Sequence, residues 1–306
     1  MRFACLAFAA AFALAGGATA DQLALDWLPP DLKWVAHLDA EAFFASELGK
    51  TLAENEQLDF ADIKFSELER HLNMDAETEL MGITVYGPVD GGEVAIISLA
   101  ETVDLQAIVD AAKDEHAEGH KKVVVDDIPL HVWDDDVVTF LAAKGSRRYV
   151  IAGEEPMLIA RAAAIALDKA DSYADADEKT MELEPPGGAM MFGAVASGRM
   201  LPDMDVVSEV IRHADAFTLA IAEREEQIEA AMSMSADSRQ RARDIVDVID
   251  GIFALVRLNA QDNEWFAEIA KFTGDAKVER TGRQITITLR TDTETLLKLL
   301  GKIDAH

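Results

Sequence analysis

Two residues near the start of the chain, His37 and Asp39, could form a general base and its orienting carboxylate. They lie two positions apart in an extended apolar run, so their side chains share one face of the predicted strand. Asp39 also precedes a helical pattern, where an N-cap carboxylate accepts a backbone N–H. No serine or cysteine nucleophile motif accompanies the pair. The sequence therefore favours a structural role: Asp39 caps a helix from about Ala40, and His37 is a polar residue that closes the strand.

A second pair, His116 and His120, has the spacing at which two side chains meet on one helical face. Imidazoles placed this way, with acidic neighbours, could hold zinc at the surface. Gly119 interrupts the helical pattern between them, so the spacing need not be helical at His120. We assign no metal ligand on this pattern.

Acidic clusters are the other candidate cation sites. They are Asp126–Asp127, Asp134–Asp136, and the group Asp171, Asp175, Asp177 and Glu178. None has the alternating ligands, central glycine and closing glutamate of a calcium loop. Aspartate is common in turns, so these clusters predict turns with weak, non-specific cation binding.

The remaining groups of similar residues have structural explanations. Methionines at 190, 191, 200 and 204 could form an adaptable binding surface, but methionine beside a buried strand more often fills the core. Arginines at 239, 241 and 243 are followed by aspartates at 244, 247 and 250, which predicts ion pairs along a helix. The sequence contains no GxSxG, HExxH, P-loop or strand-linked GxGxxG motif. We therefore assign no catalytic, cofactor-binding or metal-binding residue, and no cofactor.

Residues 1–20 have the features of a secretory signal peptide. Arg2 is followed by an apolar run and by Ala18-Thr19-Ala20, the small-residue pattern that signal peptidase cleaves. The run is shorter than the roughly 20 apolar residues that span a bilayer. We expect cleavage after Ala20 and an exported protein, periplasmic or extracellular. The single cysteine, Cys5, lies inside this segment, so the exported chain would have no disulfide and no thiol nucleophile.

The charge balance of the chain restricts its partners. Of 306 residues, 28 are Lys or Arg and 57 are Asp or Glu, which gives a net charge of −29. This charge repels phosphate backbones and anionic lipid, so we expect no nucleic-acid partner and no membrane span or attachment. Its simplest effect is solubility. The partners that it would attract are a cationic protein or divalent cations.

Hydrophobic periodicity predicts one order of elements twice. Leu28-Pro29-Pro30 and Glu184-Pro185-Pro186 each precede an apolar run, Trp34–Leu38 and Ala189–Val195, and mark the start of a strand. After each, the pattern runs strand, helix, strand, strand, helix, strand. We predict an α+β protein with two ferredoxin-like (βαββαβ) halves in tandem, the first with an added β-meander and helix.

The predicted domain boundaries follow from this repeat. Residues 21–168 form the first half and residues 187–306 the second. Residues 169–186 are acidic, with little apolar periodicity, and are expected to be an exposed link. The second half is expected to contain a helix at residues 203–213.

The chain resembles a group of uncharacterised secreted bacterial proteins whose halves are often ferredoxin-like. The segments that carry the resemblance are "LPPDLKWVAHLD", "SELGK" and "RQITITLRTDTETLLKLL". The resemblance covers most of the expected exported chain. The resemblance implies a fold and an exterior location, and it supplies no catalytic residue.

Two classes of function are consistent with the sequence. The first is an exported, soluble, non-catalytic binding or scaffold protein of unknown ligand. The alternative is a hydrolase or metal-dependent enzyme with a site in the cleft between the halves, where ligand pockets often form. An enzyme should gather polar side chains in that cleft, whereas a scaffold should fill it with apolar packing.

Overall fold

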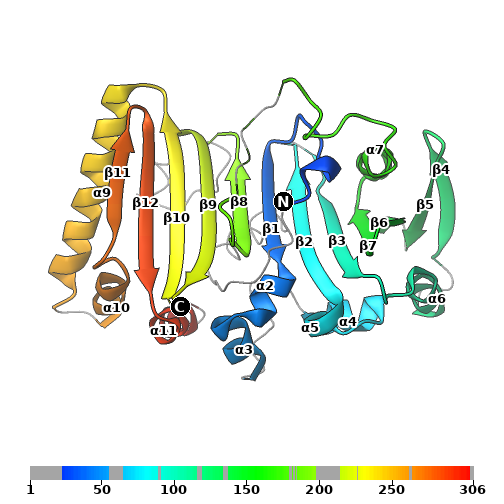
Figure 1. Ribbon diagram of the computed structural model, residues 1–306, viewed down its shortest axis with the longest axis horizontal. Helices are drawn as coiled ribbons and strands as arrows, with labels where there is room; N and C mark the ends of the chain where they lie inside the picture. Colours follow the sequence, from blue (N-terminus) through cyan, green and yellow to red (C-terminus); the bar gives the residue numbers. More distant parts are fainter. Residues whose placement is uncertain are drawn as a thin grey trace.

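The described residues form one antiparallel sheet of twelve strands, with helices packed on it (Figure 1). The structure is a computed structural model that describes residues 23–54, 65–88, 91–115, 119–133, 137–178, 181, 183, 185–197, 214–225, 227–261 and 264–303. The strand order is β11-β12-β10-β9-β8-β1-β2-β3-β7-β6-β5-β4. The α+β class is therefore confirmed. No helix in these ranges is long and apolar enough to cross a membrane.

The N-terminal half, here the elements before β8, supplies seven strands. They are β1 (Trp34–Asp39), β2 (Leu80–Gly87), β3 (Val94–Ala100), β4 (Lys121–Val125), β5 (Ile128–Trp133), β6 (Val137–Lys144) and β7 (Arg147–Gly153). Its helices are η1 (Leu25–Trp27, a 3₁₀ turn), α2 (Ala40–Ala45), α3 (Glu47–Glu54), α4 (Phe65–Leu72), α5 (Ala76–Glu79), α6 (Leu105–Glu115) and α7 (Pro156–Ala166).

The C-terminal half supplies the other five strands. They are β8 (Met191–Val195), β9 (Ala214–Arg224), β10 (Gln227–Ala236), β11 (Lys277–Thr281) and β12 (Gln284–Thr291). Its described helices are α9 (Arg239–Asn259), α10 (Glu264–Phe272) and α11 (Thr293–Ile303). The helix predicted at residues 203–213 lies outside the described residues, as does the predicted signal peptide.

The strand pairing differs from the predicted ferredoxin-like halves. A split βαβ unit contains parallel strands, whereas each pairing within the described sheet is antiparallel. β1, β2 and β3 pair in chain order, as do β8, β9 and β10, and both meanders run outward from the central β1–β8 pair. The ferredoxin-like prediction is wrong because periodicity gives the order of elements but not which strands pair. The boundary between the halves stays a prediction.

Two hydrophobic cores lie on the two faces of the sheet. Side chains alternate along each strand, so Trp34 and Leu38 of β1 belong to one core and Val35 to the other. The first core includes side chains of α2, α3, α4, α6, α9 and α11, and the second includes those of η1 and α7. Burial of apolar surface on both faces therefore stabilises the central strands.

The link predicted at residues 169–186 is not exposed throughout. Tyr173, Met181 and Leu183 are buried in the second core. The Tyr173 hydroxyl donates to the Met181 carbonyl at 2.7 Å and accepts the Leu183 N–H at 2.9 Å, and the Tyr173 N–H donates to the Leu28 carbonyl. The expectation of exposure is wrong here because these apolar side chains are too widely spaced to give a periodic pattern.

Short helices also depart from the prediction. The helix expected from about Ala40 divides at Ser46 into α2 and α3, since the Ser46 hydroxyl donates to the Phe43 carbonyl and accepts the Gly49 N–H. Helices α4, α5 and α10 were not expected. Few apolar positions define an amphipathic period in helices this short, so pattern analysis misses them.

Candidate functional site

The first candidate pair is built into the fold at the end of β1. The Asp39 side chain accepts the Ala42 N–H at 2.8 Å and caps α2, which begins at Ala40. The predicted cap is therefore confirmed. His37 is buried, and its Nδ1 lies 2.8 Å from the Thr84 hydroxyl on the neighbouring strand β2. The histidine thus links two strands rather than ending one at the surface.

We predict that both residues act on stability. Replacing the buried cap in Asp39→Ala should lower the free energy of unfolding by about 1–2 kcal/mol, measured by urea denaturation. His37→Ala should cost about 1–3 kcal/mol because it leaves the Thr84 hydroxyl without its partner. Asp39→Asn is the matched control, since its amide oxygen still accepts the Ala42 N–H. A catalytic pair would show the reverse, with unchanged stability and a lost activity.

The junction between the two halves is filled rather than open. β1 pairs with β8 along its length, and the Asp39 N–H extends the contact by donating to the Met190 carbonyl at 2.7 Å. Met190, Phe192 and Val195 are buried there, on both faces of the sheet. Apolar packing of this kind is the arrangement expected of a scaffold.

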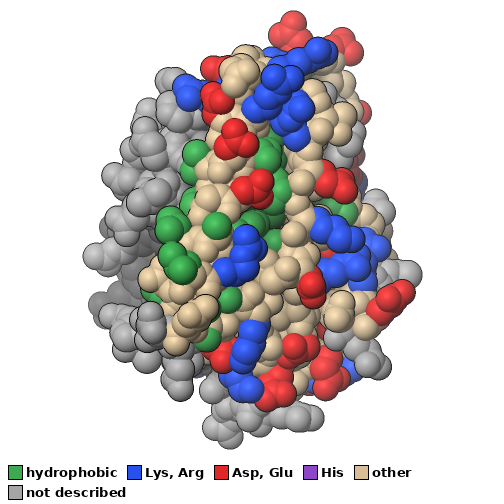
Figure 2. Space-filling view, turned by 90° about the vertical axis from the view of Figure 1, so that its left-hand side faces the viewer, with side chains coloured by type: hydrophobic (Ala, Val, Ile, Leu, Met, Phe, Trp, Pro, Cys, Tyr) green, Lys and Arg blue, Asp and Glu red, His purple; other side chains and the backbone are tan. Residues whose placement is uncertain are grey.

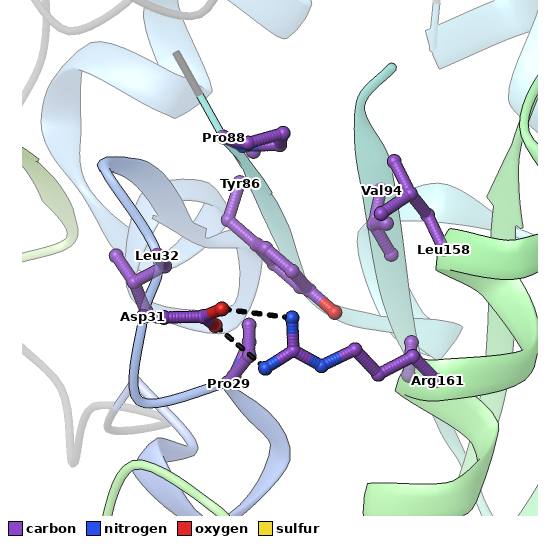
Figure 3. A pocket seen from close by; sticks show the side chains of 10 residues that line it. Pro29, Asp31, Leu32, Tyr86, Pro88, Val94, Leu158 and Arg161 are labelled. Atoms are coloured by element: carbon purple, nitrogen blue, oxygen red, sulfur yellow. Dashed lines mark hydrogen bonds and ion pairs between the residues drawn. The ribbon is translucent and has the colours of Figure 1, made fainter. Parts of the chain in front are cut away.

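A cavity of about 50 Å³ lies between the segment before β1, the end of β2, the start of β3 and helix α7 (Figure 3). Its lining is mostly apolar and includes Pro29, Pro88 and Leu158. The volume has room for a few waters or a group of a few heavy atoms. It is far smaller than the several hundred Å³ of an ordinary ligand pocket. The cavity can therefore receive the end of a ligand but not a whole substrate of ordinary size.

The polar groups of this cavity are Asp31, Arg161 and Tyr86. Arg161 of α7 donates two hydrogen bonds to the Asp31 carboxylate, at 2.7 and 3.0 Å, and these appear as dashed lines in Figure 3. Tyr86 is almost completely buried, at 4 % exposure, and lines the cavity. No hydrogen bond joins its hydroxyl to another described residue, and the hydroxyl oxygen is not one of the buried polar atoms that lack a partner, so it is accessible from the cavity. The site thus combines an ion pair with a hydroxyl that can donate into the cavity.

Electrostatics keep these groups in defined protonation states. The hydrogen bond from Arg161 holds the pKa of Asp31 below its usual value, so Asp31 is ionised at neutral pH. Burial raises the pKa of Tyr86 above its usual value. Tyr86 is therefore a neutral phenol that can donate a hydrogen bond, and it is unsuited to act as a base.

Histidines also meet at the far edge of the sheet, in a different combination from the predicted one. His120 Nε2 lies 3.0 Å from His131 Nδ1, and the His120 ring stacks on Trp133 with centroids 4.3 Å apart. His116, the predicted partner of His120, lies outside the described residues. Sequence spacing missed His131 because the contact depends on the β4–β5 register, which pairs Lys122 with His131.

The acidic clusters behave as turns where they are described. Asp126 and Asp127 both have positive φ angles, 50° and 62°, and form the two-residue turn between β4 and β5. Asp175 accepts a hydrogen bond from the Ser172 hydroxyl. Residues 134–136 lie outside the described part. Among the described residues, no group of three or more His, Cys, Asp or Glu side chains could hold a metal ion.

Helix α9 carries the clearest apolar surface, at the other end of the sheet (Figure 2). Val248, Leu255 and Leu258 are exposed along it, with Leu258 at 67 %. Such surfaces often mark contact sites. Exposed Asp244 and Asp247 lie on the same helix as Arg241, so the charge of this face favours neither a basic nor an acidic partner.

Comparison with solved structures finds a similar fold. Crystal form III of TP0453 matches with a TM-score of 0.51 at 8 % sequence identity, over 91 % of this chain and 97 % of that chain. Crystal forms I and IV of TP0453 match with TM-scores of 0.47 and 0.46, at 9 % and 10 % identity, over 91 % of this chain and 96 % and 95 % of theirs. No protein-family model and no curated protein sequence matches the chain. At this identity, the likeness to form III concerns the fold alone.

Proposed function

We propose that the chain is a non-catalytic binding protein of the cell exterior, and that the Tyr86 cavity holds the carboxylate end of a small ligand. The exterior location rests on the predicted signal peptide and on the resemblance to secreted bacterial proteins. The binding role rests on the cavity, and the ligand class follows from its donors.

The observation that carries the proposal is the Tyr86 hydroxyl. The residue is buried, its hydroxyl has no hydrogen bond with another described residue, and it lines the cavity. An acceptor that enters the cavity can take this hydrogen bond in place of water. Because the pKa of Tyr86 is raised, the hydroxyl keeps its proton and donates.

Arg161 makes a carboxylate the best-fitting acceptor. A guanidinium has about five N–H donors, and the two bonds to Asp31 leave the others available. The apolar lining, with Pro29, Pro88 and Leu158, suits a short aliphatic chain behind the carboxylate. Asp31 already neutralises Arg161, so we expect weak binding by the isolated end group.

The non-catalytic part of the proposal is supported by the junction. An enzyme with a cleft between the halves needs several polar side chains there, but buried Met190, Phe192 and Val195 occupy that place. The polar residues at the junction, His37 and Asp39, have structural hydrogen bonds. The enzyme alternative stays a hypothesis, and no arrangement of the described residues favours it.

Calorimetric titration of the exported chain with propionate tests the proposal. Propionate should bind, and Tyr86→Phe, which removes only the hydroxyl, should weaken binding at least about tenfold because a hydrogen bond to a charged group is lost. Tyr149→Phe is the matched control, since Tyr149 stacks on Trp27 away from the cavity lining and should leave affinity unchanged.

Two related probes check the ligand class. 1-Propanol should bind more weakly than propionate, and propylammonium should not bind, because the site offers donors to the ligand. Near-UV circular dichroism would show that each variant is folded. Equal propionate affinity in Tyr86→Phe, or equal binding of propylammonium, would contradict the proposal.

A further inference from the structure

We propose that His120 and His131 bind a divalent transition-metal ion of the copper(II), nickel(II) and zinc(II) class, at the edge of the sheet opposite α9. His120 immediately precedes β4, and His131 lies in β5. Their facing ring nitrogens, Nε2 and Nδ1, are 3.0 Å apart. Imidazole nitrogen is a preferred ligand for these ions.

The two facing nitrogens share one hydrogen bond, and both could bind one metal ion if the donor ring adopted its other tautomer, with its proton on the opposite ring nitrogen. At this distance one nitrogen must donate an N–H and the other must accept it, so at least one lone pair points at its partner. A metal ion binds imidazole nitrogen at about 2.0–2.1 Å. Bridging two nitrogens at this length needs a separation of at least about 3 Å, so the rings must turn but hardly separate. Water would complete the coordination.

The surroundings hold one ring and leave the other room to adjust. His131 lies within the β5 ladder, paired with β4 and β6. Trp133 stacks on His120, and its Nε1–H donates to the Thr139 hydroxyl at 3.0 Å, which fixes the indole. His120 lies outside the ladder and is only partly buried, so it can turn toward a bound ion.

Two cations lie near the histidine pair. Burial lowers the pKa of His131 and of His120, and Lys122 and Lys113 lower both pKa values further. The two lysines also repel a cation, so they should reduce affinity.

Calorimetry and electron paramagnetic resonance of the exported chain with copper(II) chloride test this site. We expect one site with nitrogen ligation that weakens at least about a hundredfold in His120→Gln or His131→Gln, because loss of even an outer partner can cost about 10–100-fold. His71→Gln is the matched control, since His71 is an exposed histidine on α4 and should leave binding unchanged. Lys122→Gln should raise affinity.

The variants separate this site from other copper ligands. Circular dichroism and thermal melting would establish that each variant is folded. Copper binding that persists in both His120→Gln and His131→Gln would overturn the proposal, as would binding that His71→Gln abolishes. Absence of binding by the unaltered chain to copper(II), nickel(II) and zinc(II) would overturn it as well.

Discussion

Met190→Ala is expected to lower the free energy of unfolding by about 2–5 kcal/mol, the range for truncating a buried methionine. Met190 is fully buried, at 0 % exposure, where the two meanders meet. Its backbone N–H donates to the Ile221 carbonyl of β9, and its carbonyl accepts the Asp39 N–H of β1. Met190 therefore lies between these two strands, in the middle of the sheet. Removing that side chain leaves a cavity that the paired strands cannot close.

Chemical denaturation of matched variants checks this prediction. Met157→Ala, at 61 % exposure on α7, should change stability by less than about 0.5 kcal/mol. Met190→Leu should cost less than about 1.5 kcal/mol because it nearly conserves volume. If Met190→Ala kept full stability and instead weakened a ligand, the methionines would be a binding surface and the packing described for the junction would be wrong.

Gly49→Ala is the second substitution with a large expected effect. A Cβ at this position would overlap the Phe43 carbonyl oxygen, a backbone atom at the end of α2, and would crowd the Ser46 hydroxyl. The methyl group can be accommodated only if α3 moves away from α2, and buried Phe43 and Leu48 pack in that region. Such overpacking costs about 1–3 kcal/mol or more, which exceeds the helix-propensity gain of about 1 kcal/mol.

A glycine-to-alanine substitution in α9 should increase stability instead of lowering it. Gly251 lies in the exposed part of α9, and a Cβ there meets nothing within 4 Å. Gly251→Ala should therefore raise the melting temperature through helix propensity, by up to about 1 kcal/mol in stability. Thermal melting of both variants measures the difference. A stabilised Gly49→Ala would contradict the close α2–α3 approach.

Local features of the fold could be predicted from the sequence because neighbours along the chain determine them. Asp39 caps α2 as expected, and Asp126–Asp127 forms a turn between two strands. The alternation of Phe217, Leu219 and Ile221 places these residues in β9, where they face one core. Each of these signals acts over a few residues, which is the range of capping, turn and pleat rules.

Features that depend on strand pairing could not be predicted in this way. The β1–β8 contact joins segments more than 150 residues apart, and periodicity contains no information about such partners. For the same reason, the sequence patterns gave no sign that Tyr86 and Arg161 line one cavity. They also suggested His116, rather than His131, as the partner of His120. Candidate sites formed by residues far apart in the sequence can therefore be recognised only when the order of the strands in the sheet is known.

The most direct test of the proposed binding function is site-specific NMR of the tyrosine rings during a propionate titration. In the chain without its predicted signal peptide, labelled with ¹³C at the tyrosine ring, the Tyr86 signal should shift saturably as its hydroxyl donates to the carboxylate. The Tyr149 and Tyr173 signals should stay in place, because Tyr149 stacks on Trp27 and the Tyr173 hydroxyl already bonds Met181 and Leu183. An unmoved Tyr86 signal at saturating propionate would contradict the account.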